Sequence, residues 1–133
     1  MKEIKAYIDR SYVNKVVANL EEAGAPGITI AETYAAGYGY EPNYSEPRLE
    51  DAYKRHGYLR IVNLEVVCTD RDVPRLVQAI RQAVWTGSKE DGWIFVSDVA
   101  MGIRIYDGAS GEEALIPERE VIQPEALPKR KAF

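Results

Sequence analysis

The sequence is poor in the residues that most often carry chemistry. It has a single cysteine, Cys68, and a single histidine, His56. One thiol cannot form an internal disulfide, which favours a reducing compartment. No apolar run approaches the roughly 20 residues of a membrane-spanning helix, and the charged N-terminal segment does not resemble a signal peptide. We therefore expect a cytoplasmic protein.

An excess of positive charge is also missing. The 17 Lys and Arg residues are outnumbered by 21 Asp and Glu residues, which gives a net charge of −4. Because nucleic-acid binding normally needs a basic face, we expect no nucleic-acid partner. The 133 residues are enough for one domain, and 46% hydrophobic with 29% charged residues is typical of a globular protein.

The few candidates for catalysis have simpler interpretations. His56 falls on a predicted loop, where a lone histidine is usually solvated. Cys68 falls in a predicted strand and is interpreted as a buried thiol. Asp70 and Asp72 are interpreted as helix-start residues near a favourable dipole. The sequence therefore predicts no catalytic residues and no metal site, and we expect a protein that is not an enzyme.

The first half of the chain contains strand and helix patterns. Residues 2–8 alternate between apolar and charged or aromatic side chains, which predicts a half-buried strand. Ser11 is expected to cap a following helix and Gly24 to end it. The apolar stripe of this helix is Val13, Val16, Val17 and Leu20. Further strands are expected around residues 28–30 and over residues 58–68.

A similar order follows in the second half. Thr69 or Asp70 is expected to cap a second helix, with Pro74 tolerated in its first turn. The apolar stripe of this helix is Val73, Leu76, Val77, Ile80 and Val84. Two short strands are predicted over residues 93–99 and 102–106. From Gly108 onward the chain is expected to be extended or disordered, with a possible short strand at "EVI".

The predicted order of elements defines a fold class. Strand, helix, strand, strand, helix, strand is the α+β, ferredoxin-like βαββαβ sandwich, with both helices on one face of an antiparallel sheet. Apolar runs such as "LEVVC" and "WIFV" indicate that the other face is also covered, and we expect another subunit to cover it. The predicted domain is residues 1–112, and residues 113–133 are a predicted extended tail.

An aromatic segment separates the second and third predicted strands. Six of the nine tyrosines lie there: Tyr34, Tyr38, Tyr40, Tyr44, Tyr53 and Tyr58. A connection of this length in a compact domain usually has a function, and tyrosines provide rigid contact surface with a polar tip. We interpret the segment as a partner-binding loop. The alternative is a loop whose tyrosines pack on their own scaffold.

Four stretches, in this order, carry a resemblance to a known family: "MKEIKAYI", "LEEAGAPGITIAE", "TGSKEDGWIFVSDVAMGIRI" and "GEEAL". Over about residues 1–115 the chain resembles the PII nitrogen-regulatory signalling proteins. The resemblance implies a non-enzymatic homotrimer that binds ATP or ADP between adjacent subunits. It also implies that residues of about 40–58 form the T-loop, which contacts a membrane transporter or a metabolic enzyme.

The resemblance also implies site residues. Nucleotide-binding residues by this comparison are Gly27, Ile28, Thr29, Gly37, Tyr38, Gly39, Glu65, Val67, Gly87, Asp91, Gly92 and Arg104. Partner-binding residues are Tyr40, Tyr44, Tyr53, Lys54, Arg55 and Tyr58. Backbone amides beside the glycines can bind phosphate whatever the neighbouring side chains are.

Several positions depart from the family pattern. Ile61 and Trp93 stand where the family has lysines, Tyr106 replaces the second of two arginines, Glu90 replaces a glycine and Glu41 replaces a glutamine. Each lost charge-assisted phosphate contact removes about 1.5–3 kcal/mol. We therefore expect no required cofactor, an effector with few phosphates such as ADP or AMP or a different small ligand, and no binding of 2-oxoglutarate.

Two alternatives from other classes stay open at this point. One is an interaction or scaffold protein that has lost ligand binding altogether, which the missing cations favour. The other is a trimeric metal-tolerance protein of a related fold, for which His56, Cys68 and scattered carboxylates are the only support.

Overall fold

The computed structural model describes residues 1–37 and 59–116. Tyr38, Gly39 and all six predicted partner-binding residues lie outside the described residues. So do Glu41, His56 and the predicted strand over residues 120–122.

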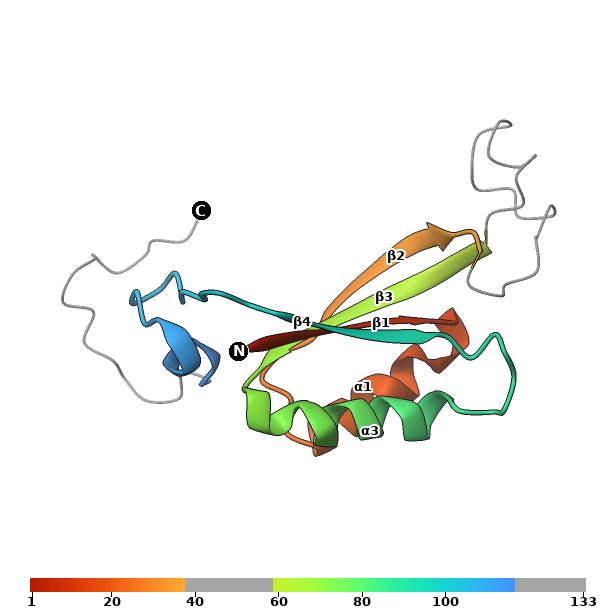
Figure 1. Cartoon of the computed structure of the whole chain (residues 1–133), viewed down its shortest axis with the longest axis horizontal. Coiled ribbons are helices and arrows are strands. Elements are labelled where there is room, and N and C mark those ends of the chain that lie inside the picture. Colours follow the sequence, from red (N-terminus) through yellow and green to blue (C-terminus); the bar gives the residue numbers. More distant parts are fainter. Residues whose placement is uncertain (38–58, 117–133) are drawn as a thin grey trace.

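Four antiparallel strands form one sheet in the order β2-β3-β1-β4. The strands are β1 (Lys2–Ile8), β2 (Thr29–Ala35), β3 (Leu59–Cys68) and β4 (Trp93–Asp98). The helices α1 (Val13–Glu22) and α3 (Val73–Val84) lie side by side on one face of this sheet (Figure 1). This is the predicted ferredoxin-like α+β fold. Among the described residues, neither helix is long and apolar enough to span a membrane.

The core lies between the sheet and the two helices. Alternation along β1 and β3 and the helical stripes of α1 and α3 direct apolar side chains into the same layer. The largest fully buried side chains are Ile4, Ile8, Val16, Leu20, Leu64, Val66, Cys68, Leu76 and Ile80. Burial of each large aliphatic side chain contributes about 1.5–3 kcal/mol, so this layer provides most of the stabilisation of the fold.

The helix ends differ in part from the prediction. The expected cap Ser11 lies inside a short 3₁₀ turn, and Asp9 is the capping residue, because its carboxylate accepts a hydrogen bond from the Ser11 backbone N–H at 2.9 Å. Thr69 precedes a similar turn at the start of α3, but its side chain makes no capping hydrogen bond. Gly24 follows the end of α1 with φ +86°, as a C-terminal stop requires.

The segment after β4 is not the predicted strand over residues 102–106. It is a tight turn held by one isolated bridge, between Ile103 and Ser110. The Gly108 N–H donates to the Arg104 carbonyl at 2.8 Å, and the Arg104 N–H donates to the Ala109 carbonyl at 2.8 Å. A 3₁₀ helix (Gly111–Leu115) then occupies part of the segment that was expected to be extended.

Neither helix covers the second face of the sheet. Strand register places Tyr7 beside Trp93 and Lys5 beside Phe95 on this face. Trp93 and Phe95 are 44% and 43% exposed. Their rings stack at a centroid distance of 6.2 Å, and Phe95 meets Tyr7 edge to face at 6.0 Å. The sheet therefore has an exposed aromatic cluster on the side away from the helices.

Candidate functional site

The predicted nucleotide-binding residues fall at two opposite ends of the sheet. One group lies beside the end of β1: Gly37, Gly87, Asp91 and Gly92. A second group lies toward its beginning: Gly27, Ile28, Val67 and Arg104. Thr29 and Glu65 pair with each other between these groups. At about 3.3 Å per residue, the seven-residue β1 separates its ends by about 20 Å.

Residues 86–92 form a loop that Asp91 holds closed. The Asp91 carboxylate accepts hydrogen bonds from the backbone N–H groups of Thr86 at 2.7 Å and Gly87 at 3.0 Å, and from the Thr86 hydroxyl. The Thr86 hydroxyl and backbone bonds hold the pKa of Asp91 below its usual value. Gly87 has φ +87°. The amides of Thr86 and Gly87 are thus already bonded to Asp91.

Gly92 allows the 86–92 loop to approach β1 closely. Its φ is +121°, and a Cβ atom at this position would lie 2.1 Å from the carbonyl oxygen of Tyr7. Such a distance is far inside van der Waals contact, so no side chain fits. Gly92 therefore positions the loop against the sheet.

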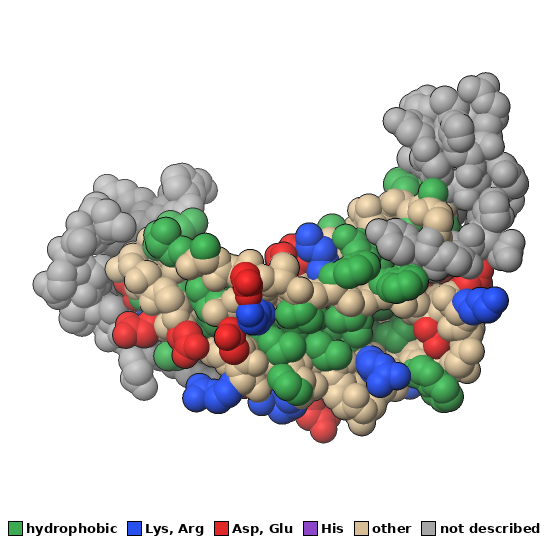
Figure 2. All heavy atoms as spheres, in the orientation of Figure 1, with side chains coloured by type: hydrophobic (Ala, Val, Ile, Leu, Met, Phe, Trp, Pro, Cys, Tyr) green, Lys and Arg blue, Asp and Glu red, His purple; other side chains and the backbone are tan. Residues whose placement is uncertain are grey.

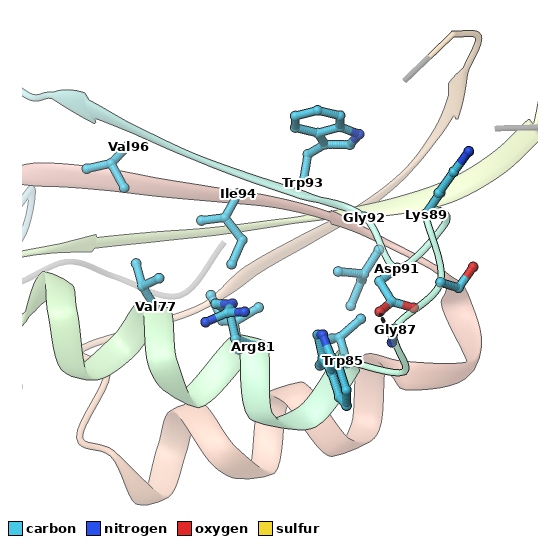
Figure 3. A pocket seen from close by; sticks show the side chains of 14 residues that line it. Val77, Arg81, Trp85, Gly87, Lys89, Asp91, Gly92, Trp93, Ile94 and Val96 are labelled. Atoms are coloured by element: carbon cyan, nitrogen blue, oxygen red, sulfur yellow. Dashed lines mark hydrogen bonds between the residues drawn. The ribbon is translucent and has the colours of Figure 1, made fainter. Parts of the chain in front are cut away.

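A cavity of about 600 Å³ lies between α3, β4 and the 86–92 loop (Figure 3). We call it the α3–β4 cavity. Its apolar walls are formed by Ile8, Val77, Ile80, Val84, Trp85, Ile94 and Val96. Arg81 and Lys89 supply its positive charge. Ile94 points toward α3, whereas Trp93 points away from that helix, so the two sides of β4 have different surroundings.

Glu65 and Thr29 lie on the uncovered face. The Asn63 side-chain amide donates to Glu65 Oε2 at 3.0 Å, and Lys5 Nζ lies 3.9 Å from the same oxygen. Thr29 is the cross-strand neighbour of Glu65, and Val67 is that of Glu3. Lys5, Asn63, Glu65 and Thr29 form a polar row at the centre of the face, with the aromatic cluster beside it.

Arg104 is bound within its own chain. Its guanidinium makes a two-point ion pair with Asp107, at 3.0 Å from Nε and 2.6 Å from Nη2. Nη1 donates to the carbonyl oxygens of Ile116 at 2.7 Å and Glu113 at 3.3 Å. Hydrogen bonds from Arg104 lower the pKa of Asp107 to about 2. A phosphate that approaches Arg104 must therefore compete with Asp107.

The departures from the family pattern have clear places in the structure. Ile61 is buried and Trp93 lies at the start of β4, beside the 86–92 loop. Glu90 lies in that loop, and Tyr106 lies in the turn after β4. Three described positions at which the family has a lysine or arginine are therefore apolar or aromatic in this chain: Ile61, Trp93 and Tyr106.

Three residues around the candidate site were not predicted from the sequence: Asp107, Arg81 and Trp85. Asp107 stands three residues after Arg104, a spacing that permits an ion pair but does not require one. Tyr7 lies two residues after Lys5 in β1, so the alternation predicts that both side chains share the face opposite Ile4, which is the uncovered one. Arg81 and Trp85 could be assigned to the cavity only after α3 and β4 were seen to pack together.

No metal site is visible in the described ranges. Among residues 1–37 and 59–116, no three His, Cys, Asp or Glu side chains are grouped as metal ligands. Cys68 is buried, and desolvation raises the pKa of its thiol. A buried thiol with a raised pKa is a poor nucleophile and a poor ligand.

Comparison with known proteins identifies the family. A family model described as nitrogen regulatory protein P-II matches residues 1–109. The nitrogen regulatory protein P-II of Bradyrhizobium diazoefficiens is 38% identical over 115 residues, which are 86% of this chain and 100% of the relative. That of Rhizobium meliloti is 37% identical over the same shares.

A more distant relative has the same coverage of this chain. The nitrogen fixation nifHD region GlnB-like protein 2 of Methanothermococcus thermolithotrophicus is 33% identical over 128 residues, 86% of this chain and 98% of the relative. The family model, the identities over most of the chain and the ferredoxin-like fold all agree with the resemblance seen in the sequence. The chain belongs to the nitrogen regulatory protein P-II family of regulatory signal-transduction proteins.

Proposed function

We propose that the chain forms a homotrimer that binds a small anionic effector, ADP or AMP, in clefts between adjacent copies. Binding of the effector then controls a transporter or metabolic enzyme that contacts residues 40–58. The observation that carries this proposal is the separation of the predicted ligand residues between opposite ends of the sheet. A cleft formed by one end of one copy and the other end of the next would bring both groups together.

The exposed apolar surface supports assembly. Trp93 and Phe95 lie on the uncovered face, and Ile103 and Ile105 are 59% and 83% exposed on the turn after β4. Monomeric proteins rarely leave large apolar patches in water, because their burial is favourable at about 25 cal/mol per Å². A ring of copies would cover the sheet face and the turn at the same time.

The charges of the site support an effector with few phosphates. Arg104 is the cation that remains at one end, and Asp107 competes for it. At the other end Trp93 occupies the position of a family lysine. Two or three missing charge-assisted contacts, at about 1.5–3 kcal/mol each, weaken a triphosphate more than a monophosphate.

One experiment separates this proposal from its main alternative. Calorimetric titration with AMP, ADP, ATP, cyclic nucleotides, bicarbonate and 2-oxoglutarate should give saturable binding of AMP or ADP and none of 2-oxoglutarate. Light scattering of the same sample should give about three times the 15.0 kDa chain mass. A monomer would contradict the assembly, and a trimer that binds none of these ligands would contradict the effector.

The second candidate is a trimeric scaffold protein without a ligand. The intramolecular pair between Arg104 and Asp107 favours it, since the last cation of the predicted phosphate site already has a carboxylate partner. In that case Arg104 serves only to hold the turn after β4. The titration above distinguishes the two functions directly.

A further inference from the structure

We infer that residues 117–127 of one copy dock in the α3–β4 cavity of the adjacent copy. This inference rests on the proposed trimer. The cavity lies on the helix side of the sheet, whereas the predicted nucleotide residues Thr29 and Glu65 lie on the uncovered face. The two sites share the 86–92 loop, because Gly87, Asp91 and Gly92 also line the cavity.

The C-terminal segment distinguishes this chain from its relatives. The Bradyrhizobium protein is matched over its whole length by 86% of this chain, and the family model ends at residue 109. The sequence beyond the described residues is therefore additional to the matched family domain. Its first part reads "PEREVIQPEAL", with apolar Val121, Ile122 and Leu127 beside three glutamates.

Arg104 fixes the point from which this segment departs. Its Nη1 donates to the Ile116 carbonyl oxygen at 2.7 Å, and its other nitrogens are held by Asp107. The described chain therefore ends at Ile116, at the Arg104 end of the sheet. In the proposed trimer this end meets the 86–92 loop of the next copy, and that loop borders the α3–β4 cavity.

The cavity has room for such a segment and is apolar enough to bind it. Figure 2 shows apolar side chains gathered in the middle of the face formed by α3 and β4, with Lys and Arg side chains near its border. Val96 is 45% exposed and Trp85 is 67% exposed, although both line the cavity. A partner segment that covered them would remove this apolar surface from water.

Charge favours the acidic part of the segment as the occupant. Arg81 and Lys89 line the cavity, whereas Asp91 is bonded to the amides of its own loop. Residues 117–127 contain Glu118, Glu120 and Glu125 with one arginine. The remaining "PKRKAF" is basic, and Arg81 and Lys89 would repel it.

Length permits the contact. An extended chain spans about 3.3 Å per residue, so residues 117–127 reach about 36 Å. β4 has six residues and measures about 17 Å along its axis. β4 is also an outer strand of the described sheet, so an extended segment can lie along it.

The two tryptophans provide a direct test. A Trp93→Phe variant leaves Trp85, which lines the cavity, as the remaining indole. Removal of residues 117–133 from this variant should shift its emission to longer wavelength, and a synthetic peptide of residues 117–127 should reverse the shift. Removal of residues 128–133 alone is the matched control and should leave the emission unchanged.

Cross-linking tests which copy is contacted. A Lys89→Cys and Leu127→Cys double variant should form covalent dimers and trimers on oxidation, and neither single variant should, because Cys68 is buried. Disulfide-bonded monomers alone would overturn docking between copies. If oxidation of the double variant produces no disulfide between positions 89 and 127, docking of the segment in the cavity is overturned.

Light scattering of every sample separates failure of this inference from failure of the proposed function. A trimer whose Trp85 emission does not respond to removal of residues 117–133 retains the proposed assembly and overturns the docking. If ADP or AMP shifts that emission instead, the cavity belongs to the effector, and the docking is again overturned. A monomer overturns both.

Discussion

Arg104 and Asp107 form a two-point ion pair that closes the turn after β4. The guanidinium Nε and Nη2 donate to the two carboxylate oxygens at 3.0 and 2.6 Å, and Nη1 bonds the carbonyl of Ile116. One side chain thus joins the turn to the end of the described chain. The same side chain is the remaining cation of the predicted phosphate site, so its structural contacts compete with the ligand-binding role proposed for it.

This pair predicts opposite effects of two substitutions on effector binding. Asp107→Asn removes the competing charge and should raise the affinity for ADP several-fold, whereas Arg104→Ala should lower it about tenfold or more, as expected for a charge-assisted contact of about 1.5–3 kcal/mol. Calorimetry measures both. Arg10→Ala, at an exposed arginine before α1, is the control. An Asp107→Asn protein that binds ADP no better than the natural chain would exclude competition.

Acid should weaken the fold through the same carboxylate. The pKa of Asp107 is about 2 in the folded protein against a usual 3.8, so its stabilising contribution is present above pH 3.8 and is lost as pH falls toward 2. In urea unfolding between pH 4 and pH 2, Asp107→Asn should therefore lose less stability than the natural chain. Glu112→Gln, at an exposed carboxylate nearby, should follow the natural chain. Equal losses in all three proteins would contradict the assignment.

Gly92 should tolerate no side chain. Gly92→Ala places a Cβ 2.1 Å from the Tyr7 carbonyl oxygen at a φ of +121°, and strain of this kind costs about 1–3 kcal/mol before any repulsion is relieved. The free energy of unfolding in urea should fall by about 2 kcal/mol or more. Gly27→Ala has open space around its Cβ and should change it by less than about 1 kcal/mol. Similar values for the two would show that the loop can move away from β1.

Trp93 should be one cause of weak triphosphate binding. Trp93→Lys restores a cation beside the 86–92 loop and should raise the affinity for ATP about tenfold relative to AMP. Phe95→Lys adds the same charge two residues along the uncovered face and serves as the control. Equal gains from both variants would mean that general charge, not a phosphate contact, is responsible.

Deletion of residues 42–56 should separate partner binding from folding. The deletion leaves the four described strands and both helices intact, and closure entropy changes slowly with loop length. The assembly and its melting temperature should be nearly unchanged, while binding to the cellular target is lost. Unfolding of the deleted protein would show that these residues are structural.

The sequence predicted the fold well because its patterns are local. Alternation in β1 and the stripes of α1 and α3 direct the same residues to the core that the structure buries. The predicted strand over residues 102–106 was wrong, because alternation alone does not distinguish a strand from a turn in so short a segment. Ile103 and Ile105 alternate like a strand, but the Arg104–Asp107 pair and Gly108, at φ +75°, bend the chain into a turn.

The site was predicted only as a set of residues. Resemblance to the family named Gly87, Gly92 and Arg104 but carried no information on their separation along β1. It also could not show that Asp91 bonds the loop amides, since this depends on the three-dimensional path of residues 86–92. The α3–β4 cavity likewise depends on the packing of elements that are not adjacent in sequence.

The placement of the predicted ligand residues at opposite ends of β1 has a genetic consequence. If each cleft combines the 86–92 loop of one copy with Arg104 of the next, a defect at either end inactivates every cleft of a uniform trimer. In a trimer that mixes the two defective chains, one cleft joins the intact loop of one to the intact arginine of the other. Two alleles that are each inactive should therefore complement one another when expressed in the same cell.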